Sequence, residues 1–355
     1  NATESSNGTV GQRIYKDLMN GVSHMLPFVI AGGIMIALSF MIDNFMGVPA
    51  DSLSKLGHYH EVAGWFNQIG NAAFGFMLPV LAGFIAMSIA DRPGLVAGFA
   101  AGALANLGGS GFLGALIGGF LAGYVVLFLK KIMKNLPKSL DGIKSILFYP
   151  LFGLMITGLL MLLINIPVSA INTGLNNFLN GLGGANAALL GALLAGMMAI
   201  DLGGPFNKAA YVFATATLTT TVAQGGSIVM AAVMAGGMVP PLAIFVATTL
   251  FKNKFNKEDR DAGLTNIIMG LSFVTEGAIP FAAADPLRAI FSFVVGSAVT
   301  GGLVGALNIR LMAPHGGIFV IPLVSQPLYY LLFIAVGAVI SGVIYGLLKK
   351  PESAK

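Results

Sequence analysis

Long apolar runs separated by short polar stretches follow the chain from Leu18 to Leu348. Several of these runs are long enough to cross the hydrocarbon core of a bilayer, which takes about 20 helical residues. The short alternating segments that are typical of a transmembrane β-barrel do not occur. The pattern therefore predicts an all-α polytopic membrane protein.

The apolar runs differ in length and in how Gly and Pro interrupt them. If two of the broken segments are re-entrant hairpins, the remaining runs predict about ten transmembrane helices. The runs lie at 22–42, 65–90, 95–107, 112–129, 146–166, 187–200, 209–222, 228–250, 289–307 and 328–348, with a further broken segment around Glu276.

Positive charge marks two of the polar stretches, 130–144 and 252–261, which are rich in Lys and Arg. Such stretches beside membrane spans are typical of the cytoplasmic side. We therefore expect both to be cytoplasmic, together with both chain ends, and we expect the charge-free stretch 167–186 to be an outer loop. The net charge of +5 does not indicate nucleic-acid binding, because the lysines cluster at the ends of apolar runs.

The composition excludes several kinds of functional site. Charged residues make up 9% of the chain and Cys is absent, so no disulfide, thiolate-bound metal or cysteine nucleophile is available. His58 and His60 are expected to be solvated loop residues, because no second pair of ligands accompanies them. We expect no metal and no cofactor, and the sequence has neither the paired aspartates nor the His-Glu-x-x-His motif of a membrane protease.

Glu276 is the residue that points most directly to a function. It lies in an apolar stretch, and Gly277 and Pro280 follow it and interrupt the helix. A carboxylate at bilayer depth is costly and usually faces a watery cavity or a solute path. We interpret it as a binding residue; the alternative is a structural carboxylate that caps a helix or pairs with Arg288.

Two further polar clusters interrupt the second half of the chain, around Asp201, Asn207 and Lys208 and around His315. Both contain Gly and Pro, as the backbone of a discontinuous helix requires. Carboxylate, amide and imidazole groups suit the hydroxyls of a neutral sugar or polyol, whereas an anion would favour arginine clusters. Asp201 and Lys208 could instead pair with each other.

His24 lies at the entrance of the first apolar run. It is a candidate for the substrate path, although a structural or interfacial role fits it better. The turn that contains Asp285 and Arg288 is expected to hold a local ion pair.

Four motifs in this order make the chain similar to a known family. They are GVSHMLPFVIAGG at 21–33, NKAAY at 207–211, TEGAIPFAAADPLR at 275–288 and APHGG at 313–317. Together they resemble the fructose-type IIC component of bacterial phosphoenolpyruvate-dependent sugar phosphotransferase systems, over about residues 12–348.

The resemblance implies a homodimeric inner-membrane sugar permease with an elevator-like movement. Its expected parts are a linker or cut end at 1–12, a scaffold domain at 13–186, a substrate-carrying domain at 187–326, and a last helix and tail at 327–355. The re-entrant hairpins are expected near 264–286 and 310–324.

The resemblance also assigns roles to residues. Glu276 would contact the hydroxyl that is phosphorylated, with Gly277 beside it and His315 in the second hairpin. Other IIC families have a histidine where this chain has Asp201, Asn207 and Lys208, so these three are the remaining substrate-binding candidates.

The phosphoryl group in such systems comes from a phosphocysteine on a B domain. Because the chain has no Cys, it carries no phosphoryl group itself, and we expect a phosphorylated IIB protein, fructose or a related sugar, and the bilayer as its partners. The alternative function is an ion-coupled secondary sugar or polyol transporter in which Glu276 is the proton site.

Overall fold

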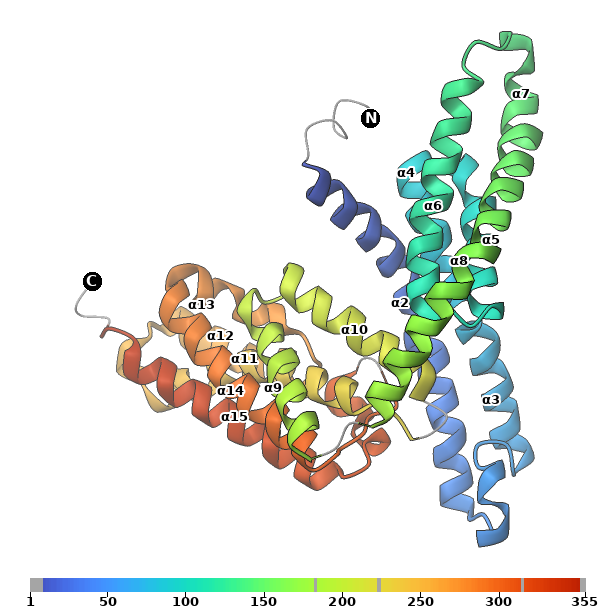
Figure 1. The fold of residues 1–355 in the computed structure, drawn as a ribbon. Coiled ribbons are helices and arrows are strands. Elements are labelled where there is room, and N and C mark those ends of the chain that lie inside the picture. The colour runs from blue at the N-terminus through green and yellow to red at the C-terminus, as the bar shows by residue number, and fades with distance from the viewer. Residues whose placement is uncertain (1–8, 182–183, 222–224, 314–315, 352–355) are drawn as a thin grey trace. The chain divides into compact units, whose positions relative to one another are not determined.

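The computed structural model describes residues 9–181, 184–221, 225–313 and 316–351 (Figure 1). Within these ranges the chain is helical, and extended pairing is confined to the isolated bridges Ser227–Leu311 and Leu311–Val324. The helices are α2 (Val10–Met46), α3 (Glu61–Phe74), α4 (Met77–Ala90), α5 (Leu95–Leu107), α6 (Gly111–Ile132), α7 (Asp141–Ile143), α8 (Tyr149–Asn180), α9 (Gly184–Ile200), α10 (Pro205–Thr221), α11 (Ile228–Leu250), α12 (Lys257–Leu271), α13 (Ile279–Ala284), α14 (Pro286–Ala306) and α15 (Pro327–Leu348).

Seven stretches of helix in the described ranges are long and apolar enough to cross a membrane. The prediction of an all-α, multi-pass membrane protein is therefore confirmed at this level. These stretches are Val10–Met46, Glu61–Ala90, Gly111–Ile132, Lys138–Phe178, Ile228–Leu250, Pro286–Ala306 and Pro327–Leu348.

The chain divides into two compact units. One contains the residues up to Gly32 together with Ile69–Asn180, and the other contains Gly33–Gln68 together with the residues from Gly181 onward.

Small residues hold the helices of the first unit close together. A Cβ added at Gly102 in α5 would collide with the Leu78 carbonyl in α4, and one at Gly119 in α6 would lie 2.9 Å from the carbonyl oxygen of Ala82. Such close approach of backbones is how helices associate where lipid offers no hydrophobic contrast. Glycine content thus explains the packing of α4, α5 and α6.

The stretch 167–186 was predicted to be a loop, and this prediction is wrong over most of its length. Helix α8 continues through Pro167 to Asn180. An internal proline removes one hydrogen bond from a helix, but side chains of α8 bond to the α5–α6 corner on both sides of it. Asn165 Nδ2 donates to the Leu104 carbonyl over 3.0 Å, and Asn172 Nδ2 donates to the Gly109 carbonyl over 3.2 Å.

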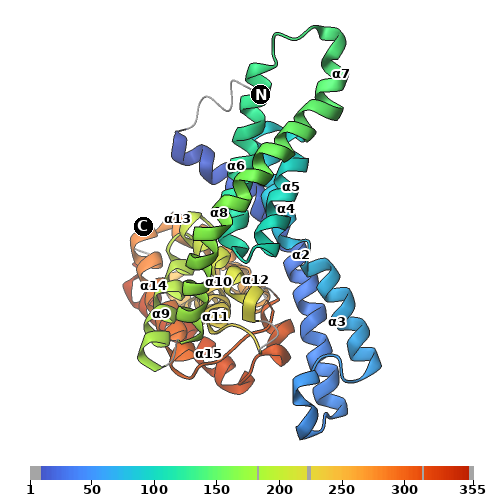
Figure 2. The same cartoon turned by 45° about the vertical axis from the view of Figure 1, so that its right-hand side comes forward.

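Helices α2 and α3 form a hairpin whose connection is organised by Asp43 (Figure 2). The buried carboxylate accepts hydrogen bonds from the backbone N–H groups of Gly57, Tyr59 and His60, at 2.6, 2.9 and 3.1 Å. The ring of His60 also contacts the Gly47 carbonyl oxygen at 2.9 Å. His60 therefore belongs to the loop structure and is more than a solvated side chain.

Helix α11 is the central helix of the second unit. Most of its length is buried, and α9, α12, α14 and α15 pack around it. Ser297 of α14 donates to the Gly236 carbonyl over 2.9 Å, and Tyr330 of α15 donates to the Ala231 carbonyl over 2.7 Å. These bonds satisfy buried hydroxyls and fix α14 and α15 against α11.

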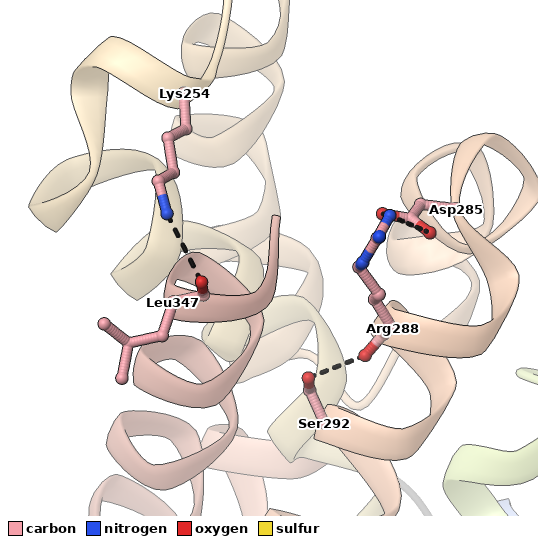
Figure 3. A network of polar contacts seen from close by, with 5 residues as sticks. All are labelled: Lys254, Asp285, Arg288, Ser292 and Leu347. Atoms are coloured by element: carbon pink, nitrogen blue, oxygen red, sulfur yellow. Dashed lines mark hydrogen bonds and ion pairs between the residues drawn. The ribbon is translucent and has the colours of Figure 1, made fainter. Parts of the chain in front are cut away.

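One end of the second unit gathers the charged loop after α11 and the end of α15. Lys254 Nζ donates to the carbonyl oxygen of Gly346 at 2.7 Å and to that of Leu347 at 3.4 Å, and so caps α15. Figure 3 shows the contact with Leu347. A cation is favourable at this end of a helix. The Asp285 carboxylate pairs with Arg288 at 3.3 Å, which confirms the local pair predicted for that turn.

Candidate functional site

The broken segment around Glu276 is a hairpin that reaches the middle of α11. Helix α12 packs antiparallel to α11, since Gly263 lies against Thr248 and Gly270 against Leu242. Thr275, at the turn, donates a 2.8 Å hydrogen bond to the carbonyl of Gly237, which lies near the midpoint of α11.

The second arm of this hairpin returns to the end of the unit where α12 begins. It consists of the turn η7 (Thr275–Ala278) and the short helix α13. Phe281 of α13 lies 6.3 Å, between ring centroids, from Phe255, which precedes α12. Both arms therefore start at the charged end of the unit, and the tip lies about half its depth away.

The Asp201 cluster forms a second turn that meets the same region. Leu202 and Gly203 have positive φ angles of 47° and 105°, so the chain reverses sharply between α9 and α10. The Asp201 carboxylate accepts hydrogen bonds from the backbone N–H groups of Phe206 at 2.7 Å and Asn207 at 3.0 Å. It therefore satisfies the free donors at the start of α10.

Asn207 is buried and bonds across this turn. Its Nδ2 donates to the Met198 carbonyl over 2.8 Å, which ties the start of α10 to the end of α9. Lys208 is exposed, and within the described residues its ammonium has no carboxylate partner. The alternative of an Asp201–Lys208 pair is therefore not what the structure has.

Glu276 and Gly203 bring these two turns together. A Cβ added at Gly203 would lie 2.8 Å from Oε1 of Glu276. The carboxyl group thus packs on the bare backbone of Gly203, at a place where any other residue would displace it. Glu276 is exposed, and among the residues that the structure describes its carboxylate has neither a hydrogen-bond donor nor an ion-pair partner. Arg288, its suggested structural partner, pairs with Asp285 instead.

The third cluster approaches the tip of the Glu276 hairpin. Gly316 and Gly317 have φ angles of 119° and 56° and lead into the turn η8 (Gly317–Leu323). A Cβ at Gly317 would collide with the Leu271 carbonyl and would lie 2.9 Å from the Phe273 nitrogen. His315 itself lies outside the described residues.

Three chain reversals therefore meet around the middle of α11. Gly237 marks the place, because the ring of Phe273, the methyl of Met198 and the hydroxyl of Thr275 all reach it. The site offers the Glu276 carboxylate, with no protein partner in the described ranges, to a ligand that donates hydrogen bonds. A hydroxyl-rich molecule fits this chemistry.

His24 has local contacts in the first unit. Its Nδ1 lies 2.7 Å from the Asn20 carbonyl oxygen, and its ring stacks on Phe84 with centroids 3.9 Å apart. These contacts fit the structural interpretation of His24.

Sequence reasoning missed Asn266. This residue lies in α12, the arm of the hairpin that leads to the Glu276 turn. The residue is 3% exposed, its Nδ2 donates to the Ala262 carbonyl over 2.9 Å, and its Oδ1 has no hydrogen-bond partner. The only signal in the sequence is one amide within the apolar stretch 264–274, and it does not show which way the amide points.

Known proteins match the chain over most of its length. A family model described as "Phosphotransferase system, EIIC" matches residues 19–297. The "PTS system fructose-specific EIIABC component" of Bacillus subtilis is 51% identical over 356 residues, covering 100% of this chain and 55% of that protein. The chain thus spans about half the length of this relative.

Two other relatives are close to this chain in length. The "Fructose permease IIC component" of Bacillus amyloliquefaciens is 54% identical over 299 residues, covering 84% of this chain and 97% of that protein. The "PTS system fructose-specific EIIC component" of Haloferax volcanii is 40% identical over 362 residues, covering 96% of this chain and 94% of that protein.

Proposed function

Because the chain belongs to the phosphotransferase-system EIIC family, we propose that it is the permease component that binds fructose, or a closely related sugar, and presents it for phosphorylation. The names of the relatives support fructose as the sugar. The observation that carries the proposal is the Glu276 carboxylate, which has no protein partner in the described residues and lies where three chain reversals meet.

Glu276 is the residue that we assign to the reacting hydroxyl. Its carboxylate accepts the hydrogen bond of that hydroxyl and turns the oxygen toward the phosphoryl donor. Gly277 follows Glu276, and its lack of a side chain leaves room for the close packing of this turn on α12. His315, which lies outside the described residues, stays a further candidate for sugar binding.

The Asp201 turn supports the site from the other side. Both oxygens of Asp201 already bond to backbone N–H groups, so this residue sets the shape of the turn that carries Gly203 against Glu276. Lys208 supplies a positive charge near the start of α10, where a phosphoryl group would benefit from one. Asn207 holds the turn to α9.

The phosphoryl donor is a IIB protein. In the reaction that we propose, the sulfur–phosphorus bond of a IIB phosphocysteine breaks and an oxygen–phosphorus bond to the sugar forms. The cysteine leaves as a thiolate, which takes up the hydroxyl proton, directly or through water. The Bacillus subtilis relative is named as an EIIABC protein, which supports a IIB partner for the present chain. This chain binds and orients the sugar.

We place the charged ends of the second unit and the loop 130–144 on the cytoplasmic side of a bacterial inner membrane. The number of spans is then about ten, and the segments near 264–286 and 310–324 are re-entrant hairpins whose tips meet at mid-depth. The positive charges of the loops support this orientation. The second half of the chain carries the sugar and moves against a scaffold that also forms a homodimer.

Transport by reconstituted protein tests the function. Liposomes containing the chain and loaded with phosphorylated fructose-type IIB protein should convert external fructose to an internal sugar phosphate, and liposomes with IIB that lacks the phosphoryl group should not. Glucose and mannitol serve as comparison sugars. Uptake that needs a proton gradient and proceeds without IIB would support the ion-coupled alternative and overturn the proposal.

A further inference from the structure

Asn266 presents a buried hydrogen-bond acceptor that the proposed function has not used. Within the described residues its Oδ1 is covered and has no donor. Buried polar atoms are rarely left without a partner, and an exception in a folded protein calls for an explanation such as a ligand or water. The acceptor is on the same hairpin as Glu276.

The orientation of this amide is determined by its other end. The carbonyl oxygen of Ala262 accepts a hydrogen bond and has no proton to give, so the group facing it at 2.9 Å must be the Nδ2 of Asn266. The oxygen of the amide therefore points away from Ala262. A flipped amide would place two acceptors together and would leave the NH₂ group buried instead.

Oδ1 of Asn266 lies against the residue that follows Glu276. A Cβ added at Gly277 would collide with this oxygen and would lie 2.8 Å from the sulfur of Met269. Only glycine allows the amide and the turn to approach so closely. The thioether of Met269 shares this position, and a methionine side chain changes its conformation easily because it is unbranched.

We propose that Asn266 is a second substrate-binding residue, whose Oδ1 accepts a hydrogen bond from a sugar hydroxyl other than the one that Glu276 binds. Movement of the Met269 side chain admits that hydroxyl. The proposal rests on the proposed function, since it takes the site around Glu276 to be the sugar site. A sugar hydroxyl would then supply the donor that Oδ1 of Asn266 lacks among the described residues.

Sugar binding by two variants of purified full-length chain tests this role. Asn266→Leu replaces the amide with an apolar group of similar size. It removes the unpaired acceptor but also the Nδ2 hydrogen bond to the Ala262 carbonyl, so the two effects offset and stability without sugar should change little. Fructose affinity should fall about tenfold, as expected for one lost hydrogen bond. Thr265→Val is the matched control, because Thr265 is exposed on the same helix, and its affinity should stay unchanged.

A series of deoxyfructoses, each lacking one hydroxyl, separates a direct contact from a general distortion. For one member of the series, the wild-type protein and Asn266→Leu should bind equally, because the hydroxyl that Asn266 would bind is already absent. Wild-type fructose affinity in Asn266→Leu, or an equal deficit for every deoxy sugar, would overturn the proposal. Folded wild-type protein that binds none of the sugars would instead overturn the proposed function.

Discussion

A carboxylate is free to bind a ligand only if the protein has not already engaged it. The carboxylates of Asp43 and Asp201 both accept hydrogen bonds from backbone N–H groups, and their role in this fold is therefore structural. Glu276 differs from them, because its carboxyl group packs on Gly203 and finds no partner among the described residues. At the residue scale, this contrast supports Glu276, rather than Asp43 or Asp201, as the carboxylate that we propose for sugar binding.

The contact between Gly203 and Glu276 leads to a first prediction. Gly203→Ala should weaken fructose binding about tenfold, because the new methyl group would lie only 2.8 Å from Oε1 and would push the Glu276 carboxylate aside. The positive φ of 105° adds backbone strain of about 1–2 kcal/mol. Fructose titration and thermal unfolding measure the two effects separately.

Gly225→Ala is the matched control for this variant. Gly225 has a φ of 102°, but a Cβ there would meet no atom within 4 Å. It should lose a similar amount of stability and keep its fructose affinity. Equal affinity losses in both variants would show that backbone strain alone accounts for the effect.

At the scale of the elements, the sequence predicts where helices break better than where they end. Gly and Pro marked the three chain reversals near Asp201, Glu276 and Gly316, because such residues interrupt helices locally. Pro167 was predicted to end a helix, but α8 continues through it. Contacts of α8 with the α5–α6 corner offset the hydrogen bond that the proline removes. Contacts between distant residues, such as Gly203 with Glu276 or Asn266 with Gly277, depend on tertiary packing and have no local signal.

The charged loops give a prediction about topology. Ser139→Cys and Asn253→Cys, in this naturally Cys-free chain, should react only with thiol reagents that cross the membrane, because both lie in lysine-rich loops. Asn253 is chosen because it is exposed and, unlike the nearby Asn256, does not cap α12. Asp51→Cys, at the far end of the α2–α3 hairpin, should react with an impermeant reagent from outside.

The comparison of inner and outer reagents in intact cells is decisive for each position. Labelling of Ser139→Cys or Asn253→Cys by the impermeant reagent from the outer face would contradict the proposed orientation.

At the scale of the whole molecule, the second unit contains all the described residues that we assign to the sugar. A sugar bound within one unit crosses a membrane if that unit moves as a body. The account therefore predicts motion between the units and rigidity within the second.

Spin labels measure this motion directly. A pair at Ser139 and Asn253 should show a distance distribution that changes when fructose is added, since the two positions belong to different units. A pair at Asn253 and Leu307, both in the second unit and both exposed, should not change. An unchanged first pair in protein that transports fructose would contradict the movement.

The central claim is that Glu276 binds the sugar, and fructose titration of the Glu276→Gln variant tests it most directly. The substitution keeps the size of the side chain and removes its charge. A hydrogen bond to a charged group contributes about 1.5–3 kcal/mol, so the account predicts a fructose affinity at least about tenfold lower than that of the wild-type protein, with unchanged thermal stability. A Glu276→Gln protein that binds fructose as tightly as the wild-type protein would contradict the account.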